Sequence, residues 1–248
     1  MDNQPLLIAA IAATFVVAGL VKGVTGMGLP TVAMGVLGAL ISPLAAASLL
    51  IVPSFVTNVW QLVAGPRVGA VLKQFWPMML AILLGTVASS SLLTEGNTAV
   101  TTGALGAALV VYACYTLFAR QLRVPARLEP WLSPAIGLVT GLITGGTGVF
   151  VIPAVPYLQS LGLEKDELVQ SLGLSFTVST VALAAGLALR GAYDPGNLWL
   201  SVLALVPALI GMWAGQIARN RISPPAFRRW FLVALLVLGT EMLLHPLL

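Results

Sequence analysis

The sequence predicts an all-α membrane protein that crosses the bilayer several times, and three observations support this fold class. Of its 248 residues, 58% are hydrophobic and only 8% are charged, whereas a soluble domain carries about 25% charged residues. The mean hydropathy is +1.00. Apolar runs of about 20 residues, enough for a helix to cross about 30 Å of hydrocarbon, recur along the chain. Because these runs lack the alternation of barrel strands, we expect helices rather than a closed barrel.

The apolar segments fall into two sets of five, separated by the polar stretch ARQLRVPARLEP at 119–130. Each set begins with two segments on either side of a glycine-rich phrase and continues with three longer ones. The segments of the first set are 6–21, 31–41, 44–64, 76–93 and 98–118. Those of the second set are 133–144, 149–161, 168–189, 197–218 and 230–245. We therefore expect a first transmembrane repeat at 1–118, a cytoplasmic linker at 119–132 and a second transmembrane repeat at 133–248.

The glycine-rich phrase indicates an internal duplication. It reads GLVKGVTGMGLP at 19–30 and GLVTGLITGGTG at 137–148, an offset of 118 residues that places Lys22 opposite Thr140. Further along, a Ser-Phe pair occurs at Ser54 and again at Ser175, an offset of 121 residues, so a three-residue insertion brings both matches into register. Glycine costs roughly 1 kcal/mol relative to alanine in a helix interior. Each phrase therefore predicts a helix that breaks inside its apolar region.

The basic residues predict how the chain is oriented, because Lys and Arg gather in cytoplasmic loops. Nine of the twelve lie in three loops, which hold Arg67 and Lys73, then Arg120, Arg123 and Arg127, then Arg219, Arg221, Arg228 and Arg229. All three loops can share one side only if each broken region returns to the side it came from, as a re-entrant hairpin or as two shorter spans. The predicted fold is thus two inverted repeats, each a glycine-broken helical hairpin followed by three transmembrane helices, with both termini outside.

Inverted repeats with broken helices are typical of secondary transporters. The second half of a broken helix presents unpaired N–H groups and the positive end of its dipole, which together favour an anion. Pro30 suits the first turn of such a half-helix, and we expect Thr147 and Gly148 at the corresponding start in the second half. We expect both ends to point at one anion site near the midplane.

Lys22 is the only base within an apolar run, and an ionisable residue there is a functional candidate by default. We expect it to contact the anion; snorkelling to an interface, or pairing with a carbonyl or an acid, are the alternatives. For Gly19, Gly23, Gly137 and Gly141 we expect helix packing.

The candidate substrate-binding residues combine the two glycine loops with hydroxyl and amide side chains at matching places on the later spans. For the hydroxyl and amide side chains, the alternative role is hydrogen bonding to their own helix or to a neighbouring one. The full set is Lys22, Thr25, Gly26, Gly28, Ser54, Asn58, Thr144, Gly145, Gly146, Thr147, Gly148, Ser175 and Ser179. Glu241, near the outer end of the last span, is a weak candidate for proton coupling.

The sequence argues against an enzyme. It has one histidine, no cluster with metal-ligand spacing and no P-loop phrase. We expect no catalytic residues, no metal, no cofactor and no nucleic-acid partner; the partners are a small anionic substrate, the lipid bilayer and, as one option, further copies of the chain in a homo-oligomer. An anion channel or facilitator, a cation–proton exchanger and a scaffolding subunit remain alternatives. The exchanger would need a carboxylate at the midplane.

The second half, GLVTGLITGGTGVFVIPAVPYLQSLGLEKDELVQSLGLSFTVST, resembles the signature region of the sulfite exporter TauE/SafE family. GLVKGVTGMGLP with the downstream SFVTN resembles that family's first repeat, although GMGLPT replaces the usual denser glycine run. The resemblance covers nearly the whole chain. It implies a multi-pass transporter that moves sulfite, thiosulfate or organosulfonates across the bacterial inner membrane. We expect export, by alternating access in which one repeat-derived unit moves against the other.

Overall fold

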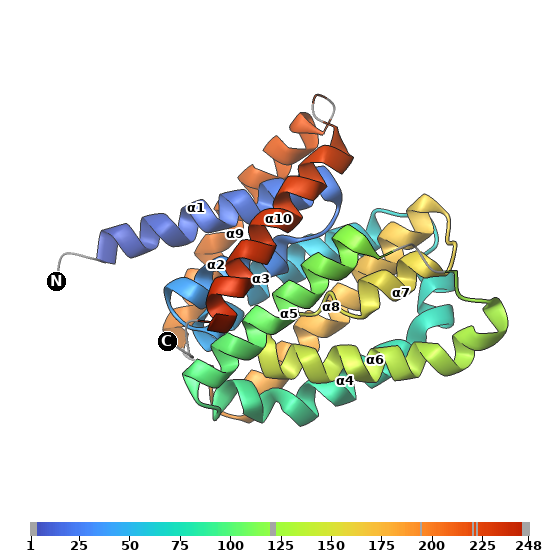
Figure 1. Cartoon of the computed structure of the whole chain (residues 1–248), viewed down its shortest axis with the longest axis horizontal. Helices are drawn as coiled ribbons and strands as arrows, with labels where there is room; N and C mark the ends of the chain where they lie inside the picture. The colour runs from blue at the N-terminus through green and yellow to red at the C-terminus, as the bar shows by residue number, and fades with distance from the viewer. Residues whose placement is uncertain (1–3, 120–122, 194, 220, 222, 245–248) are drawn as a thin grey trace.

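The computed structural model describes residues 4–119, 123–193, 195–219, 221 and 223–244. In this part of the chain it is all-helical (Figure 1). The first half contains α1 (Gln4–Thr25), α2 (Leu29–Leu40), α3 (Pro43–Val63), α4 (Val68–Thr94) and α5 (Thr98–Phe118). The second half contains the short 3-10 helix η1 (Ala126–Leu128), α6 (Glu129–Thr147), α7 (Ala154–Ser160), α8 (Lys165–Leu189), α9 (Pro195–Ala218) and α10 (Pro224–Leu244).

The predicted all-α fold class is confirmed, and both halves have a broken hairpin, α1–α2 and α6–α7, followed by three long helices. The inverted orientation of the two halves in the membrane stays a prediction. Six described helices, namely α1, α3, α4, α5, α8 and α9, are long and apolar enough to cross a membrane. The exterior is apolar as well, since all six tryptophans are at least 60% exposed. Large apolar side chains that face outward suit contact with lipid rather than water.

The two halves are held together by an exchange of their first helices. Helix α1 packs along α9 of the second half, and α6 packs along α4 of the first. Figure 1 shows α6 lying beside α4 on one side of the molecule, with α1 and α9 on the other. Helices α3 and α8 pack against each other between these pairs, as do α5 and α10. Each half therefore supplies the packing partner that the other half lacks.

Glycines allow the exchanged helices to approach closely. A Cβ atom on Gly19 would collide with the backbone of Ala208 and Met212 on α9, and one on Gly23 with the backbone of the following turn. Gly141 and Gly145 have the same relation to α4, at Ile82–Thr86 and Thr86–Ser90. The predicted packing role of Gly19, Gly23, Gly137 and Gly141 is confirmed, since each would meet the backbone of a neighbouring helix.

The packing glycines of the two halves keep the 118-residue offset of the letters. Gly23 meets α9 at Met212 and Gly215, and Gly141 meets α4 at Ile82 and Gly85, through the same set of backbone atoms. The ends of α1 and α6 differ from this register by one turn. Gly26 and Gly148 both have positive φ, and Thr25 and Thr147 each donate to the carbonyl four residues back and accept from the N–H two residues ahead, at an offset of 122 residues. Helix α6 therefore continues one turn further than α1 before it breaks.

The charged loops separate to two ends of the bundle. At one end, called here the basic end, Arg67 forms an ion pair with Glu167, and Lys165 and Arg219 line a common pocket. At the opposite end Arg190 forms an ion pair with Glu95, with 2.9 Å between nitrogen and oxygen. This separation is what the positive-inside rule leads one to expect of cytoplasmic and outer faces.

The two helix breaks lie toward opposite ends of the bundle. The α1–α2 break reaches the basic end, where Gly26 and Met27 line a pocket with Lys165 and Arg219. The α6–α7 break lies near the other end, where Leu92, three residues before Glu95, is 3.6 Å from a Cβ placed on Gly146. This placement differs from the expectation that both breaks meet at one point.

The glycine contacts predict that Gly19→Ala destabilises the protein. A methyl group at Gly19 must push α1 away from α9, and overpacking of this kind costs about 1–3 kcal/mol. Gly69→Ala is the matched control, because Gly69 is helical and a Cβ there meets nothing within 4 Å. Thermal unfolding followed by tryptophan fluorescence should show a lower melting temperature for Gly19→Ala only. Equal melting curves would mean that α1 and α9 do not pack as described.

Candidate functional site

Lys22 is buried near the end of α1 and is only 4% exposed. Its Nζ donates to Thr57 Oγ1 at 3.1 Å and to Asn58 Oδ1, both on α3. The two ion pairs among the described residues are formed by Arg67 and Arg190. The partners of the Lys22 ammonium group are therefore both neutral. An amide and a hydroxyl orient the ammonium group but leave its charge uncompensated.

A pocket of about 490 Å³ opens beside Lys22 at the basic end. The α1–α2 break forms one wall, with Thr25, Gly26 and Met27. The end of α3 and the start of α8 form the others. Its charged lining residues are Lys22, Lys165, Asp166 and Arg219. Three cations and one carboxylate give the pocket a net positive charge, which attracts small anions.

Deeper than Lys22, the seam between α3 and α8 holds polar groups without partners. Ser54, Asn58, Ser175 and Ser179 are 0% exposed. The hydroxyls of the three serines and the Nδ2 of Asn58 make no hydrogen bond in the described structure. Each pair is spaced by four residues, so both members lie on one face of their helix. Since buried polar groups normally have partners, these four, all predicted as site residues, lie where a polar ligand or water would be expected.

The backbone of α3 is kept helical beside this seam by a serine from α9. Pro53 lacks an N–H, so the carbonyl of Leu49, four residues earlier, loses its usual donor. Ser201 Oγ donates to that carbonyl at 2.8 Å and accepts from the N–H of Val52 at 3.1 Å. Ser201 therefore supports the helix turn that leads to Ser54.

Gln170 on α8 closes the end of α3 at the pocket. Its Nε2 donates to the carbonyl of Leu62 at 2.8 Å, and its Oε1 accepts from the N–H of Arg67 at 2.9 Å. A Cβ on Gly65 would collide with this side chain. Gln61 adds a bond from its Nε2 to the carbonyl of Val169 at 2.9 Å. These contacts hold the basic ends of α3 and α8 together.

The first break has the predicted form of a half-helix start. Gly28 is the N-cap of α2, with φ of 103°, and Pro30 lies in the first turn. No side chain caps this end, so the N–H groups of its first turn lack partners within the helix. The hydroxyl of Thr31 is also buried without a partner. Thr25 instead bonds to the carbonyls of Val21 and Met27 and stabilises the end of α1.

The second break does not have the predicted form. Thr147 is the last residue of α6 and Gly148 its C-cap, whereas α7 begins only at Ala154. The expectation that Thr147 and Gly148 start the second half-helix is therefore wrong. The intervening run, VFVIP, is rich in β-branched residues and ends in Pro153, a composition that favours extended chain.

The other predicted residues of the second loop make structural contacts. The hydroxyls of Thr144 and Thr147 donate to carbonyls of their own helix at 2.7 Å. Gly145 packs on the backbone of α4. A Cβ on Gly148 would lie 2.6 Å from Cε of Met34. No residue of 144–148 lines the Lys22 pocket. The structure thus brings the first loop, Asn58 and Lys22 together and places the second loop elsewhere.

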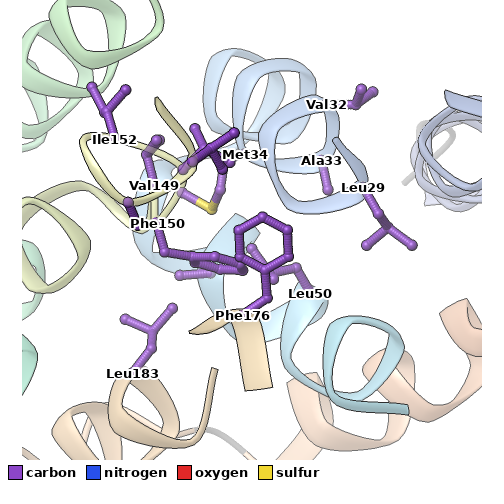
Figure 2. Close-up of a cluster of buried hydrophobic side chains, with 14 of the residues drawn as sticks. Leu29, Val32, Ala33, Met34, Leu50, Val149, Phe150, Ile152, Phe176 and Leu183 are labelled. Atoms are coloured by element: carbon purple, nitrogen blue, oxygen red, sulfur yellow. The ribbon is translucent and has the colours of Figure 1, made fainter. Parts of the chain in front are cut away.

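Apolar side chains fill the space next to the second break. Figure 2 shows Met34 of α2 against Val149 and Phe150, with Phe176 of α8 and Leu50 of α3 beside them. The rings of Phe150 and Phe176 have centroids 5.5 Å apart. Leu50 and Leu183 lie one turn beyond Ser54 and Ser179 toward the opposite end. This apolar cluster, as we call it, borders the polar seam on the side away from the pocket.

Glu241 is remote from the Lys22 pocket. It lines a separate cavity of about 330 Å³ with Ser42, Thr98 and Thr102 near the opposite end. Its role in proton coupling stays a prediction. Within the described residues no group of three His, Cys, Asp or Glu side chains is placed to hold a metal ion.

Sequence reasoning did not identify several residues of this region. Thr57, Gln170 and Ser201 each act through a contact more than 30 residues away along the chain. Pro53 inside an apolar segment was a usable signal, because it implies a carbonyl that needs a donor from elsewhere. No signal of that kind pointed to Lys165 or Arg219 as pocket residues.

Comparison with known proteins gives one match. The model of a family described as Sulfite exporter TauE/SafE matches residues 11–242, nearly the whole chain. No curated protein and no solved structure matches the chain.

The bond from Ser201 to Leu49 predicts that Ser201→Ala lowers stability by about 1–3 kcal/mol, because it leaves a buried carbonyl without a donor. Pro53→Ala restores an N–H in α3 that can serve this carbonyl. The loss of stability caused by Ser201→Ala should therefore be smaller in the Pro53→Ala background. Thermal unfolding of the parent, the two single variants and the double variant measures this difference. An equal loss in both backgrounds would contradict the proposed link between the two residues.

Proposed function

The chain belongs to the sulfite exporter TauE/SafE family, and from this premise we propose a specific activity for it. Membership implies a membrane transporter of sulfite or a related anion. We propose that this chain is a secondary transporter that exports small sulfur-containing anions, such as sulfite, thiosulfate or organosulfonates, by alternating access between two inverted repeats. Its place would be the bacterial inner membrane, with the basic end in the cytoplasm and both termini outside.

Lys22 is the observation that carries this proposal. A cation buried in a membrane protein is costly unless its charge is compensated. Lys22 has only Thr57 and Asn58 as hydrogen-bond partners, and it faces a pocket that also holds Lys165 and Arg219. A bound oxyanion would supply the missing negative charge. The surrounding cations would also raise the local concentration of anions at the entrance.

The partnerless groups of the α3–α8 seam suit the next step of the path. Ser54, Ser175 and Ser179 offer hydroxyl donors, and Asn58 offers its free Nδ2. Sulfite, thiosulfate and sulfonates carry several acceptor oxygens, which neutral donors can bind without holding the anion too tightly to release it. We propose that the anion passes from Lys22 to this seam.

The apolar cluster would act as the barrier on the far side of the seam. Phe150, Phe176 and Met34 lie there, and Leu50 and Leu183 complete it (Figure 2). The pocket opens at the basic end, so this arrangement would be the inward-facing state of the proposed mechanism. Movement of one unit against the other would part the cluster and close the Lys22 pocket.

The exchanger alternative finds little support, because no Asp or Glu among the described residues is buried. A cation–proton exchanger would need such a carboxylate near the seam. An anion channel or facilitator differs from a secondary transporter because its flux is not coupled to an ion gradient. The following measurement tests for this coupling.

We expect saturable uptake of radiolabelled sulfite into proteoliposomes, responsive to a pH gradient and competed by thiosulfate or sulfoacetate. Lys22→Gln should lower the transport efficiency about 10- to 100-fold, since a charge-assisted hydrogen bond contributes about 1.5–3 kcal/mol. Lys73→Gln is the control: it removes an exposed lysine that does not line the pocket. Uptake that saturates but ignores the gradient would indicate a facilitator. Equal uptake by Lys22→Gln and the parent would remove Lys22 from the path.

We further expect Asn58→Asp to impair transport while preserving the fold. The new carboxylate would form an ion pair with Lys22 and cancel the charge that attracts the anion. Asn97→Asp is the matched control, because Asn97 is an exposed N-cap of α5 and aspartate caps a helix equally well. A raised KM for sulfite in Asn58→Asp alone is the expected result. An unchanged KM in a folded Asn58→Asp protein would show that the anion does not meet Lys22.

A further inference from the structure

A second basic pocket lies on the other side of the α1–α2 break. Its volume is about 640 Å³, and Arg228 and Arg229 of α10 line it together with Thr116 at the end of α5. Thr25 and Met27 of the break also line it. Both ion pairs of the described residues involve other arginines, Arg67 and Arg190. The two guanidinium groups therefore lie in a pocket without a carboxylate partner.

The rest of the pocket is apolar and faces outward. Leu117 and Phe118 of α5, and Leu232 and Val233 of α10, form its remaining wall. Phe118 is 77% exposed and Val233 is 38% exposed, on helices whose outer surfaces are apolar. The pocket thus combines two cations at the basic end with an apolar wall that continues onto the lipid-facing surface.

We propose that this pocket binds the headgroup of an anionic phospholipid. The phosphate would be held by the guanidinium groups of Arg228 and Arg229. The acyl chains would lie against Phe118 and Val233. Basic pockets between helices at the cytoplasmic side suit such headgroups. A free phosphate would use the arginines but would leave the apolar wall without a role, so the lipid is the better match.

A lipid in this pocket would touch the same loop that borders the Lys22 pocket. Thr25 and Met27 line both pockets, one on each side of the break. Tyr112 of α5 also bonds to this loop, from its hydroxyl to the sulfur of Met27 at 3.9 Å. A bound headgroup would therefore fix the position of the break from the side opposite to the proposed anion path.

The test is lipid binding by the purified full-length protein, measured by native mass spectrometry. The probes are phosphatidylglycerol and phosphatidylcholine with identical acyl chains, and glycerol 3-phosphate as a headgroup without chains. Two arginines near one phosphate should favour phosphatidylglycerol by about thirtyfold. Arg228→Gln/Arg229→Gln should reduce this preference to about threefold or less. Arg228→Lys/Arg229→Lys should retain most of it.

The matched control is Arg123→Gln/Arg127→Gln, which removes two exposed charges from the linker. It should keep the parent's full preference for phosphatidylglycerol. The variants are compared after each has been shown to melt at the temperature of the parent. The proposal is overturned if the Gln pair at 228 and 229 binds like the parent, or if the linker pair loses the preference equally. Displacement of phosphatidylglycerol by an equimolar amount of glycerol 3-phosphate would instead indicate a site for free phosphate. No transport is measured, so the result is independent of the proposed substrate.

Discussion

The close approach of α1 to α9, with its counterpart between α6 and α4, is the constraint on which the rest of the structure depends. Within lipid there is no hydrophobic driving force between helices, so association relies on close packing and on hydrogen bonds. Gly19 and Gly23 provide that packing for α1, as Gly141 and Gly145 do for α6. Because Gly23 faces α9, its neighbour Lys22 is directed toward α3, where Thr57 and Asn58 accept hydrogen bonds from its Nζ. The same contact that joins the halves thus places the buried cation.

The region around Lys22 combines strong local support with an unsatisfied centre. Ser201 and Gln170 complete the hydrogen bonding of α3 at Pro53 and at its basic end. Between these two supports, Ser54 and Asn58 retain groups without partners. A core of apolar residues would be easier to stabilise than this polar seam. This contrast between supported helix ends and partnerless groups supports the proposal that the seam binds the anion.

The sequence predicted the fold class and the packing glycines because both depend on local composition: long apolar runs specify spanning helices, and GxxxG specifies close contact. The register of the packing glycines also followed from the letters, but α6 continues one turn further than α1 before it breaks, which the matching letters did not show. The start of α7 was missed because a glycine phrase shows where one helix ends, not how far the extended chain continues. Lys22 was identified as a buried base. Its partner Thr57 was not, because that contact depends on which faces of α1 and α3 meet.

The exchange of first helices has a consequence for how the chain is made. Helix α4 meets α6 soon after both leave the ribosome, but α1 must wait for α9, whose first residue follows about 170 positions later. At roughly 5–20 residues per second, that interval is about 10 to 30 seconds. During it the glycine face of α1 lies in the bilayer with no partner. Biogenesis is therefore ordered: the α1–α9 contact forms late, and the α5–α10 contact can be completed only after it. A nascent chain that stops before α9 leaves the glycine face of its first helix without its packing partner.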